Sequence, residues 1–138
     1  MTNYGDVWMN EIYIAVDGDS IGKIIENYIL SNELIELKSF SLQLQNDVVN
    51  IGKIIEENKG SLFLQGGDNL LGLIHTLRLN TVFEYVNNLN SIRKYHFSMG
   101  LGDTSLDAYL ALKYAKLKNM SPIYFDNKKS TFLRYECP

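Results

Sequence analysis

Two short apolar segments joined by a glycine turn constrain the fold of this chain more than any other feature. Residues 61–65 (S-L-F-L-Q) and 69–75 (N-L-L-G-L-I-H) have the length of strands, and Gly66-Gly67-Asp68 joins them. A glycine-rich turn between two apolar runs predicts a β-hairpin, here with Asp68 at its tip. The two glycines allow a tight turn and leave space for a phosphate-bearing ligand beside the backbone.

A second strand ends at another Asp-Gly sequence. Residues 11–16 (E-I-Y-I-A-V) are a nearly continuous apolar run, which predicts a buried strand that stops at Asp17-Gly18-Asp19. Apolar residues then recur at helical spacing in two segments. They predict one helix with Ser20 available as its N-cap and a longer helix from about Glu33, with Gly60 suited to a left-handed cap at its end.

The rest of the chain continues the alternation of helices and strands. The same criteria predict a helix within 77–89, a strand over 95–101, a helix from a cap at Asp103 or Thr104 to about residue 118, a strand over 123–125 and an edge strand over 131–135. The order βααββαβαβ favours an α+β, ferredoxin-like fold, with helices packed on one face of a mixed, mainly antiparallel sheet. In that topology the first strand is central and lies beside the hairpin, so Asp17 and Asp68 meet at one edge of the sheet.

Length and composition exclude several classes of protein. The 138 residues suit one domain, 1–138, and a hydrophobic fraction of 46% excludes a disordered chain. No apolar run approaches the roughly 18 residues of a membrane span, so we expect no membrane contact. The one cysteine, Cys137, excludes a disulfide framework and a cysteine-based metal site. These features predict a soluble, cytoplasmic protein.

The charge is distributed unevenly along the chain. Residues 1–90 carry 5 Lys and Arg against 12 Asp and Glu, whereas residues 91–138 carry 8 against 4. The overall charge of −3 argues against a partner of duplex nucleic acid, since such proteins are usually basic. An acidic centre that faces a basic wall suits metal ions with an anionic ligand. An uneven scatter of surface charges explains the same numbers equally well.

The two aspartates that the topology brings together suggest a metal site. Mg²⁺ prefers a few oxygen ligands, and Asp17, Asp68 and the main-chain carbonyl of Gly18 would supply them. Two such ions activate an attacking hydroxyl and stabilise a leaving pyrophosphate in phosphoryl chemistry. A Gly-Gly-Asp triplet alone is a weak motif, and a plain hairpin turn with a polar tip is the alternative.

Three segments resemble a known family, in the right order. They are Y-I-A-V-D-G-D-S-I-G-K at 13–23, F-L-Q-G-G-D-N-L-L at 63–71 and M-G-L-G-D-T-S-L-D-A-Y-L-A-L-K-Y-A-K at 99–116. Together the chain resembles a polymerase/cyclase palm of the GGDEF and CRISPR-polymerase superfamily. It most resembles the minimal CRISPR polymerase (mCpol) group, which consists of stand-alone palms related to the large subunit of type III CRISPR complexes.

The resemblance implies roles for individual residues. Asp17 stands at the family's metal aspartate on the first strand and Asp68 at the first acidic position of the hairpin, with two Mg²⁺ or Mn²⁺ ions per site. Lys116 matches the family's phosphate-binding lysine. Asn69 departs from the pattern, because many relatives carry an acidic residue there, and Asp19 is a candidate third carboxylate. Lys23 lies near a helix N-terminus, where it would meet a triphosphate or simply face solvent. The predicted substrate-binding residues are Gly18, Lys23, Gly66, Gly67, Asn69 and Lys116.

The resemblance also implies a reaction. It predicts a nucleotidyltransferase that makes a cyclic dinucleotide or short cyclic oligonucleotide, with ATP as the favoured nucleoside triphosphate, cyclic di-adenylate as the product and a role in prokaryotic antiviral signalling. The family further implies an effector that responds to the cyclic nucleotide. A lone palm has no fingers or thumb to hold a second substrate, so we expect a homodimer.

Three alternative functions stay open on the sequence. A diguanylate cyclase uses the same metal chemistry, although the hairpin G-G-D-N-L lacks the Glu-Phe of that family. A non-catalytic sensor of nucleotides or cyclic dinucleotides is suggested by Asn69. A ferredoxin-like interaction module would need no site at all.

Overall fold

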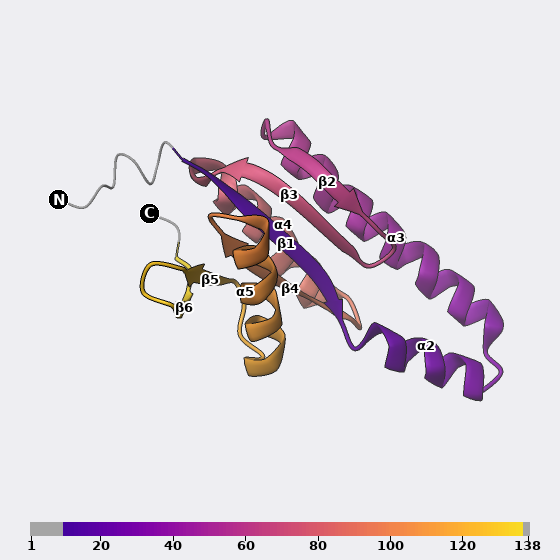
Figure 1. Ribbon diagram of the computed structural model, residues 1–138. Coiled ribbons are helices and arrows are strands. Elements are labelled where there is room, and N and C mark those ends of the chain that lie inside the picture. The colour runs from indigo at the N-terminus through magenta and orange to yellow at the C-terminus, as the bar shows by residue number, and fades with distance from the viewer. Residues whose placement is uncertain (1–9, 137–138) are drawn as a thin grey trace.

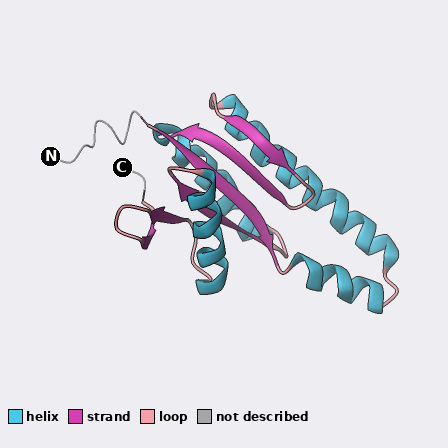
Figure 2. Ribbon diagram, in the orientation of Figure 1, coloured by secondary structure: helices cyan, strands magenta, loops and turns pink. Residues whose placement is uncertain are grey.

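The computed structural model describes residues 10–136, so Cys137 lies outside the described residues. Its helices and strands follow the order expected from the sequence (Figures 1 and 2). In chain order they are β1 (Glu11–Asp19), α2 (Ile21–Leu30), α3 (Leu34–Glu57), β2 (Ser61–Gln65), β3 (Asn69–His75), the 3₁₀ helix η1 (Thr76–Arg78), α4 (Leu79–Ile92), β4 (His96–Gly102), α5 (Ser105–Lys118), β5 (Ile123–Asp126) and β6 (Thr131–Arg134).

The strands form one six-stranded sheet in the order β2-β3-β1-β4-β5-β6. The β4–β5 pair is parallel, whereas the other four neighbouring pairs are antiparallel. The first strand lies between β3 and β4, with Asp17 opposite Asn69 on one side and opposite Ser98 on the other. The sheet confirms the prediction of a mixed, mainly antiparallel α+β fold with a central first strand.

Both faces of the sheet carry helices. Successive residues of a strand point to opposite faces, so neighbouring residues of β1 show which helices cover each face. Ile14 and Val16 belong to the main core, which α3 and α4 cover, whereas Ala15 packs with Ala108 and Leu112 of α5. In Figure 1, α5 lies in front of the sheet and α3 and α4 lie behind it. The prediction that all helices pack on one face is therefore wrong for α5.

The position of α5 follows from two glycines of β4. A Cβ atom at Gly100 would lie 2.2 Å from the backbone nitrogen of Leu112, and one at Gly102 would lie 2.4 Å from the Cβ of Asp107. The backbone of α5 therefore contacts the backbone of β4 almost directly. This close contact fixes the end of α5 that carries Lys116 over the sheet.

Three local expectations need correction. The first strand does not end at Val16 but continues through Asp19, since its last residues pair with β4. Ser20 is the residue before α2, yet it has φ 57° and its side chain makes no capping hydrogen bond. The left-handed residue after α3 is Lys59 (φ 65°) and not Gly60, where a Cβ atom would lie 2.7 Å from the carbonyl oxygen of Leu73.

Other expectations are confirmed. The hydroxyl of Thr104 accepts a hydrogen bond from the backbone N–H of Asp107 and caps α5, and the edge strand β6 is present.

None of the helices within residues 10–136 has the length and apolarity required to cross a membrane.

Candidate active site

The end of β1 and the tip of the β2–β3 hairpin lie together at one end of the sheet, as the topology predicted (Figure 1). The backbone N–H of Gly18 donates a hydrogen bond of 2.9 Å to the carbonyl of Asp68. Asp17 and Asp68 are both only partly exposed, and the negative charge of Asp17 acts on the Asp68 carboxyl group. Two acidic side chains, one near the end of β1 and one in the β2–β3 turn, therefore share one site.

The ammonium group of Lys116 lies against this site. Its Nζ atom donates to Asp17 Oδ2 at 2.8 Å and to the carbonyl oxygen of Gly18 at 3.2 Å, and it lies 3.9 Å from Asp19 Oδ1. About three quarters of each partner is shielded, since the Lys116 and Asp17 side chains are 28% and 23% exposed. The ammonium group thus binds the Asp17 carboxylate and the Gly18 carbonyl, two of the three groups predicted to hold a metal ion.

Asp68 is harder to ionise than an ordinary aspartate. Partial burial raises its pKa, the neighbouring Asp17 carboxylate raises it further, and Lys116 opposes both effects. The Asp17 carboxylate raises this pKa more than the Lys116 ammonium group lowers it, so Lys116 leaves part of the negative charge of the site uncompensated. The site therefore favours the binding of an additional cation.

Asp19 faces the other side of the site, toward β4. Both of its carboxylate oxygens accept from the Ser98 hydroxyl, at 2.8 and 2.9 Å, and Oδ2 lies 3.3 Å from His96 Nδ1. Nowhere in residues 10–136 do three His, Cys, Asp or Glu side chains gather closely enough to hold a metal ion by themselves. Asp19 thus has partners of its own, beside the pair of Asp17 and Asp68.

The glycines of the site act through their missing side chains. Neither Gly66 nor Gly67 has a positive φ, so the prediction that the turn needs the backbone freedom of glycine at these positions is wrong. A Cβ atom at Gly66 would lie 2.6 Å from Asn69 Oδ1, one at Gly18 would lie 2.7 Å from Ile21 Cγ1, and one at Gly67 would meet nothing within 4 Å. Gly67 therefore leaves the hairpin tip open, as the approach of a bulky ligand requires.

Of the remaining predicted substrate-binding residues, Lys23 lies apart from this cluster of contacts and Asn69 borders it. The side chain of Lys23 is exposed in the first turn of α2 and makes no hydrogen bond or ion pair with the residues that the structure describes. Asn69 begins β3 opposite Asp17, and its backbone carbonyl accepts from Gly66 N–H at 2.9 Å.

Comparison with protein families now decides the relationship. The model of the minimal CRISPR polymerase domain (mCpol) matches residues 13–125, which include both aspartates and Lys116. The chain belongs to the mCpol family. This membership makes it a palm domain of the nucleotide polymerase and cyclase kind. No curated protein has a sequence that matches it significantly.

Solved structures show the same fold as this mCpol chain at low sequence identity. A diguanylate cyclase/phosphodiesterase from Caldicellulosiruptor saccharolyticus is 13% identical, with a TM-score of 0.58 over 91% of this chain and 80% of that one. An EAL/GGDEF domain protein from M. capsulatus is 16% identical, with a TM-score of 0.52 over 80% of each chain. The GGDEF relation expected from the three segments is thereby confirmed at the level of the fold.

The oxygen atoms at the site suit the divalent ions with which palms of this fold generally work. Mg²⁺ and Mn²⁺ prefer carboxylate, carbonyl and water oxygens. Asp17, Asp68 and the Gly18 carbonyl provide two carboxylates and one carbonyl, and a protein cation already binds two of these three groups. The residues present therefore fit a divalent ion that displaces the ammonium group of Lys116.

A pocket beside Asp68 was not predicted from the sequence. It has a volume of ≈ 340 Å³, and residues of α2, α3 and the hairpin tip line it. Its lining residues are Ile21, Gly22, Ile25, Ser41, Leu44, Gln45, Gly67 and Asp68. Ser41 and Gln45 are ordinary polar residues of a long amphipathic helix, so no sequence signal singles them out.

Proposed function

We propose that this mCpol domain joins and cyclises nucleoside triphosphates into a cyclic dinucleotide or short cyclic oligonucleotide. The observation that supports the proposal most strongly is the pairing of Asp17 and Asp68 around the Gly18 carbonyl, with Lys116 against them. Each joining step forms a bond between a ribose hydroxyl oxygen and the α-phosphorus of a second nucleotide. The same step breaks the bond from that phosphorus to the bridging oxygen, and pyrophosphate and a proton leave.

The two aspartates and the Gly18 carbonyl would hold the divalent ions. When bound, such ions lower the pKa of the attacking hydroxyl and neutralise the charge that builds on the leaving pyrophosphate. Asp17 lies on the central strand, so its position is fixed by hydrogen-bonded neighbours on both sides. Asp68 is fixed by the bond between its carbonyl and Gly18 N–H, which keeps the hairpin tip against β1.

Lys116 would change partners during the reaction. In the free protein its ammonium group neutralises Asp17, and a divalent ion would take over that role. The released ammonium group then reaches the β- and γ-phosphates of the substrate, where it stabilises the growing charge of pyrophosphate.

The pocket between α2 and α3 would hold the base. Apolar side chains such as Ile25 and Leu44 line it, and Asp68 at its rim places a nucleotide bound there next to the metal site. An amide such as that of Gln45 both donates and accepts, which matches the N6 amino group and ring nitrogens of adenine. Guanine would favour a carboxylate acceptor, and the one carboxylate among the lining residues, Asp68, is the group assigned to the divalent ions. These features support ATP as the substrate and cyclic di-adenylate as the product.

A homodimer is part of the proposal, because a phosphodiester bond joins two nucleotides and one palm has one such site. Two copies with facing sites would each supply one bound nucleotide. The proposal also includes a cytoplasmic location, on the evidence of composition, and a role in antiviral signalling with an effector that responds to the cyclic product, which the family resemblance implies.

Incubation of the protein with each nucleoside triphosphate and Mg²⁺ or Mn²⁺, followed by mass spectrometry, tests the proposal. A cyclic adenylate product supports it, whereas cyclic di-guanylate would favour the diguanylate cyclase alternative. Asn69→Asp, which restores the acidic residue of many relatives, should preserve or raise turnover and lower the Mg²⁺ requirement. If both proteins bind a nucleotide tightly but form no product, the domain is a sensor and the enzyme proposal is wrong.

A further inference from the structure

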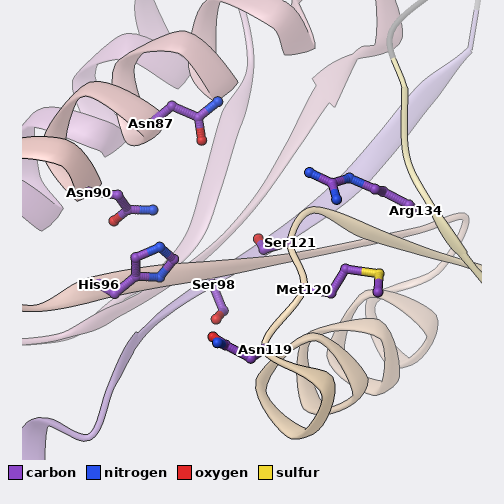
Figure 3. A pocket seen from close by; sticks show the side chains of 8 residues that line it. All are labelled: Asn87, Asn90, His96, Ser98, Asn119, Met120, Ser121 and Arg134. Carbon is purple, nitrogen blue, oxygen red and sulfur yellow. The ribbon is translucent and has the colours of Figure 1, made fainter.

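A second pocket lies at the same end of the sheet, where Ser98, one of its lining residues, donates to Asp19 (Figure 3). It has a volume of ≈ 370 Å³, which is in the range of small-molecule sites, roughly 300–1,000 Å³. The pocket arises because β4 begins before its neighbour β5, whose first residue Ile123 pairs with Gly100. Its lining residues are Asn87, Asn90, His96, Ser98, Asn119, Met120, Ser121 and Arg134.

Three of the polar lining groups are already engaged and form a rigid wall. The Asn90 side chain exchanges two hydrogen bonds with the backbone of Phe97, at 2.8 and 3.0 Å. The Ser121 hydroxyl accepts from the backbone N–H of Met99 at 2.8 Å, and the Ser98 hydroxyl donates to Asp19. The shape of this wall is therefore set by the fold rather than by any ligand.

Three other lining groups have unused hydrogen-bond donors. The side chains of Asn87, Asn119 and Arg134 make no hydrogen bond or ion pair within residues 10–136. They come from α4, from the end of α5 and from β6, and Figure 3 shows them around one space, with the Arg134 guanidinium extended toward it. A guanidinium group and two amides at one pocket, with no carboxylate among the lining residues, suit a ligand that accepts hydrogen bonds and carries negative charge.

The pocket is also connected to the candidate active site. His96 and Ser98 line it and both contact Asp19, while Asp19 lies 3.9 Å from the Lys116 ammonium group that binds Asp17. A chain of direct contacts thus leads from the pocket to the metal-binding oxygens. A ligand that contacts His96 or Ser98 in the pocket would therefore be separated from the Lys116 ammonium group by one side chain, that of Asp19.

From these contacts we infer that the pocket is a phosphate-binding site in which Arg134 supplies the positive charge and Asn87 and Asn119 supply neutral donors. The inference goes beyond nucleotidyl transfer, since it holds for an inert protein as well. The phosphate group has two possible sources: the distal phosphates of the nucleotide at Asp17 and Asp68, or a separate phosphorylated molecule. Arginine is suited to either, because its planar fork binds two phosphate oxygens at once.

Titration with inorganic pyrophosphate in the absence of divalent ions tests the inference. Binding should shift the NMR signals of the Asn87 and Asn119 side-chain amides. Arg134→Gln should raise the dissociation constant for pyrophosphate about 10- to 100-fold, the amount expected for the loss of a charge-assisted hydrogen bond. Arg78→Gln is the matched control, since Arg78 is an exposed arginine in η1 outside the pocket. The affinity of this variant for pyrophosphate should stay within about twofold of that of the original protein.

The outcomes separate the two sources and the two proposals. If a non-hydrolysable ATP analogue with Mg²⁺ displaces pyrophosphate from the pocket, the site serves the phosphates of the substrate. If both bind together, the site takes a separate phosphorylated ligand. Equal affinities of Arg134→Gln and Arg78→Gln, or signals that shift only around Lys116, would overturn the inference. Because the readout is binding, a protein without turnover can still support it, so its failure is distinguishable from failure of the proposed enzyme.

Discussion

Replacement of Lys116 by methionine should change metal binding and nucleotide binding in opposite directions. In the free protein the Lys116 ammonium group occupies Asp17 Oδ2 and the Gly18 carbonyl, so an incoming divalent ion must displace it. Methionine keeps the apolar part of the side chain and removes the charge. The variant should therefore bind Mn²⁺ more tightly without nucleotide, yet need more nucleotide for half-maximal turnover.

The size of the effect follows from the contacts of the ammonium group. A hydrogen bond between charged groups contributes about 1.5–3 kcal/mol, and each 1.4 kcal/mol changes an equilibrium constant tenfold. The pair is about three quarters shielded from solvent, so screening reduces this value only in part. Lys116→Met should lower the dissociation constant for Mn²⁺ by roughly tenfold and raise KM for the nucleotide by a similar factor.

Electron paramagnetic resonance of free Mn²⁺ measures the first effect, and steady-state kinetics measure the second. Lys113→Met is the matched control, because Lys113 lies on the same helix but contacts the ring of Tyr109 instead of the site. Unchanged or weaker Mn²⁺ binding by Lys116→Met would refute the view that the lysine and the metal ion share the same oxygens.

Three further substitutions test the energetics of the fold and the site. Asp68→Asn should abolish turnover yet raise the Tm of the metal-free protein at pH 7. The raised pKa of Asp68 means that its contribution to stability is lost as pH rises above the ordinary value of 3.8, so Tm should fall more between pH 4 and 7 in the original protein than in the variant. Gly100→Ala should cost about 1–3 kcal/mol or more in urea unfolding, because its methyl group would meet the backbone of Leu112 at 2.2 Å and push α5 away from the sheet. Arg93→Met should cost about 1.5–3 kcal/mol in the same assay, since it removes hydrogen bonds of 2.8 and 3.1 Å to the buried Asp47, with no effect on KM.

Local patterns in the sequence predicted the strands and helices well. The hairpin bounds of β2 and β3, the buried apolar face of α4 and the threonine cap of α5 all depend on neighbouring residues, and each is present. The meeting of Asp17 and Asp68 was also predictable, because it depends only on which strands are adjacent.

The placement of α5 and its consequences could not be predicted in this way. The connections β3-α4-β4 and β4-α5-β5 both join parallel strands and run in the same direction across the sheet, yet their helices lie on opposite faces. The two crossovers therefore have opposite hands, and the usual right-handed rule holds for only one of them. Gly100 and Gly102 permit the unexpected contact, but a glycine in a strand has several other meanings in a sequence. The pocket that Arg134 lines was not predictable either, because its residues come from α4, β4, β6 and the end of α5.

Release of pyrophosphate tests the central claim most directly, because one pyrophosphate must leave for every phosphodiester bond that forms. With ATP and Mg²⁺ or Mn²⁺, the protein should release two pyrophosphates for each cyclic dinucleotide detected by mass spectrometry. The variants Asp17→Asn and Asp68→Asn should release none while keeping the circular dichroism spectrum of the original protein. Pyrophosphate release that persists in either variant, or that is absent from the original protein with all four nucleoside triphosphates, would contradict the assignment of these two aspartates to nucleotidyl transfer.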